Sequence, residues 1–80
     1  MREDVYYHNR LMGRTYAEQD IRKIEALRGS VSPQELGRAI RLQLTEYEAK
    51  LKEAESMNER SGVAHYSAYI ATFRAIVSRG

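Results

Sequence analysis

The sequence predicts an all-α fold: an antiparallel bundle of three to four helices built around one long helix over about residues 33–60. Apolar residues recur at three- and four-residue steps along most of the chain, as they do on the buried face of a helix. Helix-breaking residues are rare, one proline and five glycines, and they indicate breaks near Gly13, across 29–32 and at 61–62. We therefore expect a single helical domain over residues 1–80.

Two short helices are expected before the break at Gly29. The first covers about 3–12, where acidic residues at the start suit the positive end of the helix dipole, although its apolar periodicity is weak. The second begins at Thr15, which forms a capping-box pattern with Glu18. The pattern leaves open whether Gly13 separates two helices or kinks one, and whether the first helix is ordered without a partner.

The helix that begins at Pro33 has the clearest start signal. Ser32 can cap it, proline is favoured at the first helical position, and Glu35 stands three residues after the cap. Its apolar residues then form one stripe that continues almost to Gly62: Leu36, Ile40, Leu44, Tyr47, Leu51, Ala54 and Met57. At 1.5 Å per residue such a helix is roughly 40 Å long, so more than one shorter helix must cover it.

The final helix, expected over 63–78, is apolar around nearly its whole circumference. One face carries large side chains and the opposite face carries alanines: Val63, Tyr66, Ile70, Phe73 and Val77 against Ala64, Ala68, Ala71 and Ala75. A helix of this kind is normally buried on all sides, which one short chain cannot easily achieve. We therefore expect a second copy or another partner to cover it, through Tyr66, Tyr69, Phe73, Ile76 and Val77. The alternative is that the alanines face water and only the large side chains are buried.

Charge along the long helix gives a second indication of association. Arg38 and Arg41 lie in its N-terminal half, and its C-terminal half is rich in glutamate, the reverse of what the helix dipole favours. An antiparallel pairing of two such helices would set basic ends beside acidic ends, with the two arginines at the rim. The alternative is a solvated face with no partner.

The residues needed for catalysis or metal binding are scarce. Cysteine is absent and only two histidines are present, so Asp4 and His8, one helical turn apart, lack the further ligands that a metal site needs. There is no glycine-rich phosphate loop, and no serine is accompanied by a recognisable base. We expect no enzyme activity, no cofactor and no metal.

Composition indicates a cytoplasmic protein that crosses no membrane. Charged residues are spread through the first twelve positions, which leaves no apolar segment for a signal peptide. No stretch approaches the roughly 18 apolar residues of a membrane span. The lack of cysteine suits a reducing compartment, and the net charge of +2 is too small to indicate a nucleic-acid partner by itself.

A competing interpretation comes from the stretch 24–50. A helix ends at 27–29, and a capped helix start follows at 32–40, with Gly37 as the small residue after a leucine. This arrangement resembles the opening of helix-turn-helix DNA-binding domains, and the resemblance implies a DNA-binding regulator. It covers about a third of the chain and departs from the pattern at Arg41, where a turn glycine is usual. The helix that would enter the DNA groove also displays several glutamates, which repel phosphate.

A weaker form of the nucleic-acid hypothesis keeps one long helix and uses a basic surface patch. Tyrosines near the N-terminus could stack on bases beside such a patch. Its candidate phosphate contacts are Arg10, Arg14, Arg38 and Arg41.

The function that remains after these exclusions is binding. We expect a non-enzymatic protein–protein interaction module, a small regulator, adaptor or inhibitor, that forms a homodimer. A nucleic-acid-binding regulator is the alternative.

Overall fold

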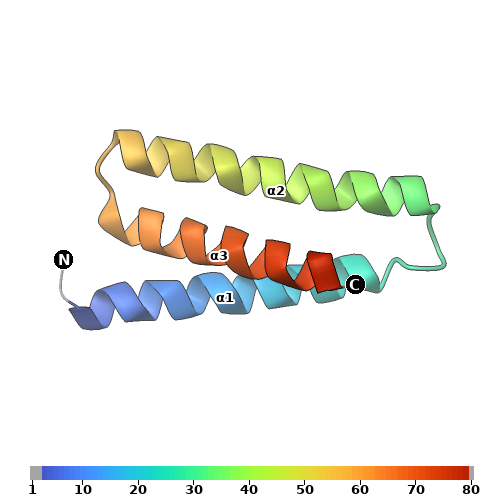
Figure 1. Cartoon of the computed structure of the whole chain (residues 1–80), viewed down its shortest axis with the longest axis horizontal. Helices are drawn as coiled ribbons and strands as arrows, with labels where there is room; N and C mark the ends of the chain where they lie inside the picture. The colour runs from blue at the N-terminus through green and yellow to red at the C-terminus, as the bar shows by residue number, and fades with distance from the viewer. Residues whose placement is uncertain (1–2, 80) are drawn as a thin grey trace.

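The computed structural model describes residues 3–79 and consists of three helices, α1 (Glu3–Glu25), α2 (Pro33–Ser56) and α3 (Arg60–Arg79). Successive helices run in opposite directions, so α1 and α3 are parallel and α2 is antiparallel to both (Figure 1). The predicted all-α antiparallel bundle is confirmed, with three helices. The molecule is elongated, with principal dimensions of 44 × 22 × 17 Å.

The last helix lies between the other two. α3 contacts both α1 and α2 extensively, whereas α1 and α2 touch each other only sparsely (Figure 1). We call the end where α1 starts and α2 passes into α3 the open end, and the end where α1 passes into α2 the closed end. The core cluster is centred on α3: Ala17, Tyr69, Ile70 and Phe73.

The N-terminal third of the chain forms one helix, not two. α1 continues through Gly13, and Thr15 lies inside it, where its hydroxyl donates to the Leu11 carbonyl oxygen at 2.9 Å. The predicted capping box at Thr15 is therefore wrong. Gly13 is buried against α3, and a Cβ atom added to it would stand 2.2 Å from the His65 carbonyl oxygen. This glycine permits a close approach of two helices instead of ending one.

The start of α2 follows the predicted pattern. Gly29, at a φ of 91°, lies in the turn before it, and the Ser32 hydroxyl accepts a hydrogen bond from the Glu35 amide at 3.1 Å. Pro33 occupies the first turn, where its missing amide hydrogen costs nothing. The apolar stripe faces inward, with Leu36 and Ala54 buried.

The end of α2 differs from the prediction. The helix stops at Ser56 instead of near 60, because the chain reverses through Asn58 in the left-handed region, at a φ of 56°. Met57 leaves the apolar stripe and is 60% exposed. Gly62, predicted as a break, lies within α3, where an added Cβ would come within 3.1 Å of the Ala54 Cβ.

Candidate functional site

The predicted interface residues on α3 divide into core and partly exposed side chains. Tyr69 and Phe73 are 0% exposed within the single chain, so they offer no surface to a partner. Tyr66 is half-buried, with its ring 5.8 Å from that of Tyr47. Ile76 and Val77 are also half-buried and line a small cleft of about 150 Å³ at the closed end. The expectation that Tyr69 and Phe73 contact a partner is corrected: they form the protomer's own core.

The alanine face explains why α3 can be buried without a second copy. Gly13 on α1 abuts the backbone of α3 at His65, and Ala64 and Ala68 beside this contact are 2% and 6% exposed. Small residues on parallel α1 and α3 let the two backbones approach closely, as the alanines suggested. The neighbour, however, belongs to the same chain. Only the C-terminal part of that face, at 71 and 75, is exposed.

A polar network ties the three helices together at the middle of the bundle. The Tyr69 hydroxyl on α3 donates to Asp20 Oδ2 on α1 at 2.5 Å. The Gln43 amide on α2 donates to the Tyr69 hydroxyl at 2.9 Å and to Asp20 Oδ2 at 3.1 Å. Burial, together with the hydrogen bond to Asp20, raises the pKa of Tyr69 well above its usual value near 10. Each member of this network therefore has a partner, and its role is structural.

Aromatic rings extend the same contact toward α2. Tyr47 stacks on Tyr69 with ring centroids 3.5 Å apart and an interplanar angle of 5°. Burial raises the pKa of Tyr47, and the Asp20 charge adds to this effect. The stack uses two of the six tyrosines for folding and leaves the tyrosines of the open end for other contacts.

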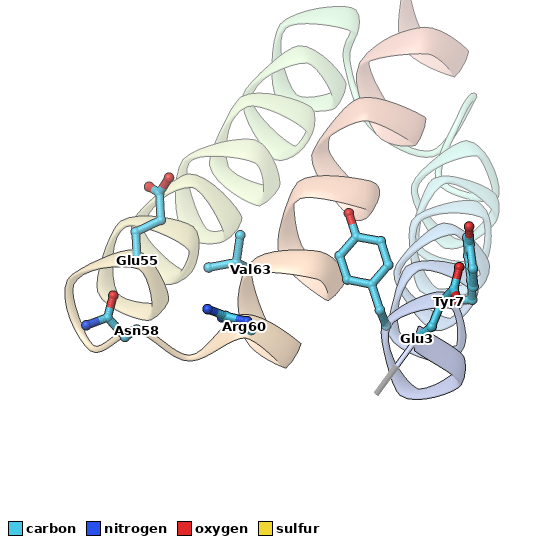
Figure 2. Close-up of a pocket in the computed structure, with 7 residues that line it drawn as sticks. Glu3, Tyr7, Glu55, Asn58, Arg60 and Val63 are labelled. Carbon is cyan, nitrogen blue, oxygen red and sulfur yellow. The ribbon is translucent and has the colours of Figure 1, made fainter. Parts of the chain in front are cut away.

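A hollow lies at the open end of the described chain. It has a volume of about 630 Å³ and is lined by all three helices: Glu3, Tyr6, Tyr7, Glu55, Asn58, Arg60 and Val63. Figure 2 shows Glu3 and Tyr7 on α1 across from Glu55 and Asn58 near the end of α2, with Arg60 and Val63 from the start of α3 between them. We call this hollow the open-end groove.

The groove exists because α1 begins beyond the first turns of α3. Every residue over 3–8 is exposed, although Tyr6 and Tyr7 are large and aromatic. Their rings meet edge to face with centroids 5.9 Å apart, and the Arg10 guanidinium lies 5.8 Å from the centroid of the Tyr6 ring. Tyr7 remains 60% exposed. The ring of Tyr7 is therefore largely accessible at the groove, and that of Tyr6 is partly accessible.

The sequence contains only weak indications of this groove. The weak apolar periodicity over 3–12 already indicated that this segment has no complete buried face. The adjacent pair Tyr6 and Tyr7 cannot both face one core, since neighbours on a helix point about 100° apart. That Glu55 and Val63 lie opposite them depends on the turn at 57–59 and was not predicted.

The four arginines of the predicted basic patch do not gather. Asp20 and Gln43 mark one level of the bundle, because they are hydrogen-bonded. Counting helical rise from that level, the α1 pair, Arg10 and Arg14, lies roughly 12 to 22 Å along the axis from the α2 pair, Arg38 and Arg41. The two pairs also lie on the helices that scarcely touch.

The described chain also does not contain the turn that the helix-turn-helix resemblance implies. α2 runs from Pro33 to Ser56 as one helix, so no turn occurs at Arg41. A recognition helix separate from the first helix is therefore absent from the described chain. This observation removes the structural basis for that form of the nucleic-acid hypothesis.

Side chains that could bind a metal ion or act in catalysis are few over 3–79. No three histidine, cysteine, aspartate or glutamate side chains there lie close enough to hold a metal ion. His65 packs between Tyr16 and Tyr66, at ring distances of 5.4 and 5.3 Å, and burial lowers its pKa, with the Lys50 charge acting in the same direction. None of the helices over 3–79 is both long and apolar enough to span a membrane.

Comparison with protein-family models, curated proteins and solved structures finds no match for this chain.

Proposed function

We propose that this protein is a non-enzymatic interaction module, a small regulator, adaptor or inhibitor that binds another protein through the open-end groove. The observation that carries the proposal is the exposure of Tyr6 and Tyr7 over a hollow that also contains Val63. These side chains lie where none of the three helices over 3–79 fully covers them.

Two physical arguments support binding at this place. Tyrosine and arginine are enriched where protein surfaces meet, and the groove contains both kinds of residue. Its volume of about 630 Å³ falls in the range of sites that hold a few side chains or a small ligand. An aromatic ring that is 60% exposed, such as Tyr7, can still bury a large apolar area when a partner covers it.

The homodimer predicted from α3 stays a prediction. Its premise was that one chain could not cover both faces of the helix, and α1 and α2 now flank α3 within one protomer. The antiparallel pairing of two α2 helices by charge also remains a prediction, which light scattering on the purified protein would test. A cytosolic location belongs to this proposal because the chain has no cysteine.

Site-specific photo-crosslinking tests the proposal. A photoreactive phenylalanine analogue replaces Tyr7 in one variant and Leu42 in a control. The two native side chains are both 60% exposed, but Leu42 lies outside the groove. Crosslinking in the cells that produce the protein should attach position 7, and not position 42, to another protein.

The pattern of adducts decides the outcome. Equal crosslinking at both positions, or none at either, would contradict binding through the groove. Adducts of position 7 with nucleic acid alone would favour the alternative function instead.

A further inference from the structure

We infer that the occupant of the open-end groove is a peptide segment of another protein in which a large apolar side chain is flanked by arginine or lysine. This inference rests on the function proposed above and specifies the chemistry of the partner. It follows from the apolar lining of the groove and the charge around it.

The apolar part of the groove determines which side chain of the ligand binds there. We call that side chain the anchor. Tyr6 and Tyr7 lie on α1, and Val63 projects from the first turns of α3 (Figure 2). An aromatic or large aliphatic side chain placed among them would bury apolar surface on several sides. A small polar anchor would leave the rings and Val63 in contact with water and would gain none of this burial.

Charge at the open end determines which residues of the ligand should flank the anchor. Glu3 and Glu55 lie on separate helices at the groove, and the ion pairs among residues 3–79, Arg28–Glu25 and Arg74–Glu48, involve neither of them. Over 3–10 and 53–60 there are five acidic and two basic residues, which are Glu3, Asp4, Glu53, Glu55 and Glu59 against Arg10 and Arg60. A ligand with positive charge on both sides of its anchor complements this surface, whereas nucleic acid is repelled by it.

The opposite end of the molecule has the reverse charge. Over 20–41 and 70–79 there are seven basic and three acidic residues. Two copies cannot join open end to open end without bringing like charges together. A head-to-tail contact would bring opposite charges together, and Leu27, which is 43% exposed beside Arg28, lies at the closed end. The Arg28 guanidinium binds the Glu25 carboxylate through contacts of 2.8 and 2.9 Å, so its charge is partly offset within the chain, and the charge-reversed variants below distinguish a second copy from a segment of a different protein.

Fluorescence polarisation with three labelled peptides tests this inference. Each peptide has glycine and serine at its two ends and a different central sequence. The first has tryptophan between pairs of arginines, the second has tryptophan between pairs of glutamates, and the third has serine between pairs of arginines. The full chain should bind the first peptide at least about tenfold more tightly than either of the others, a difference that two rim charges and one buried ring can supply. Added salt should weaken this binding.

Charge-reversed variants locate the binding site. Glu3→Lys combined with Glu55→Lys should weaken binding of the arginine–tryptophan peptide by about tenfold or more. The control combines Glu18→Lys with Glu46→Lys, which makes the same change of net charge on the same two helices. These control positions lie roughly 22 and 14 Å along the helices from Glu3 and Glu55. Binding by the control should remain within about threefold of the parent chain.

A second pair of variants examines the anchor. Tyr7→Ser should reduce binding of the arginine–tryptophan peptide, whereas Leu42→Ser, at a side chain equally exposed but outside the groove, should leave it unchanged. Because neither side chain is buried, both variants should fold, which circular dichroism checks.

Different results would contradict the inferred ligand and the proposed function. Equal binding of all three peptides, or equal effects of the two charge-reversed pairs, would overturn the inferred chemistry. If position 7 still crosslinks to a protein in cells, the interaction module stands and only its ligand class is wrong. Higher-order assemblies that dissociate in the Glu3→Lys and Glu55→Lys variant would show that a second copy fills the groove, and this result would also overturn the inference.

Discussion

The closed and open ends of the bundle use aromatic and apolar side chains in different ways. Toward the closed end, α3 is enclosed by the other two helices, and Phe73 and Tyr69 are 0% exposed. At the open end, α1 extends past the start of α3, and Tyr7 is 60% exposed at the groove. The comparison shows that apolar character alone does not determine whether a side chain is buried. The position of a residue relative to the ends of neighbouring helices makes that distinction.

The largest expected effect comes from the core of the closed half. Phe73→Ala should lower the free energy of unfolding by about 3–5 kcal/mol, because it removes a fully buried ring and leaves a cavity. A domain of this size has little more stability than that to lose. Urea denaturation followed by circular dichroism measures the change. A loss below about 1 kcal/mol would mean that the core can collapse around the cavity or that α3 is less enclosed than described.

The next effect concerns the contact between α1 and α3. Gly13→Ala should lower the free energy of unfolding by about 1–3 kcal/mol, because its Cβ would overlap the His65 carbonyl oxygen and push the helices apart. The same measurement on Gly37→Ala provides the control. There the nearest atom is the flexible Arg41 guanidinium at 3.4 Å, so the better helix propensity of alanine should raise stability by about 0.5–1 kcal/mol. Equal effects at both glycines would contradict the close approach.

A smaller effect is expected at the network where the three helices meet. Tyr69→Phe should cost about 1–2 kcal/mol near neutral pH, because Asp20 and Gln43 lose a shared partner. Hydrogen exchange at the amides of α2 would report the loosening.

The same variant predicts a change in alkaline stability. Burial, and then the hydrogen bond to Asp20, raise the pKa of Tyr69 in the folded chain above its unfolded value near 10. Below about pH 10 both states hold the phenol proton and the stabilisation is complete. As the pH rises further, the unfolded chain releases the proton first, so stability falls. Unfolding measured from pH 8 to 12 should show this loss in the parent chain and a smaller loss in Tyr69→Phe; identical profiles would contradict the assignment.

The smallest effect on folding should come from the open end. Tyr7→Ser should change the free energy of unfolding by no more than about 0.5 kcal/mol, because the side chain is mostly exposed. Thermal and urea denaturation measure this value. A loss comparable to that of Phe73→Ala would show that the open end belongs to the core and would remove the contrast between the two ends.

Parts of the fold could be predicted because their cause is local. The cap at Ser32 requires only a side-chain oxygen and an amide three residues later, and the structure contains that hydrogen bond. The inward stripe of α2 follows from helical spacing, and Leu36 and Ala54 are buried as expected. The end of α2 was harder to predict, because Asn58 reverses the chain without a glycine or proline.

The candidate site could not be predicted in the same way. The alanine face of α3 correctly indicated a close neighbour, but Gly13, taken as a possible helix break, proved to be part of that neighbour. Tyr69 and Phe73 were assigned to an interface because core and interface residues share the same chemistry. Glu55 and Val63 joined the groove only through the turn between α2 and α3.

The sequence by itself determined that the chain is helical, where α2 begins and which of its residues face inward, because these properties depend on neighbours within one or two helical turns. Tertiary structure decided that α1 is continuous, that α3 lies between the other helices and that exposed aromatic residues gather at one end. Helical periodicity identifies the apolar face of a helix, but only the packing of whole helices determines what covers that face.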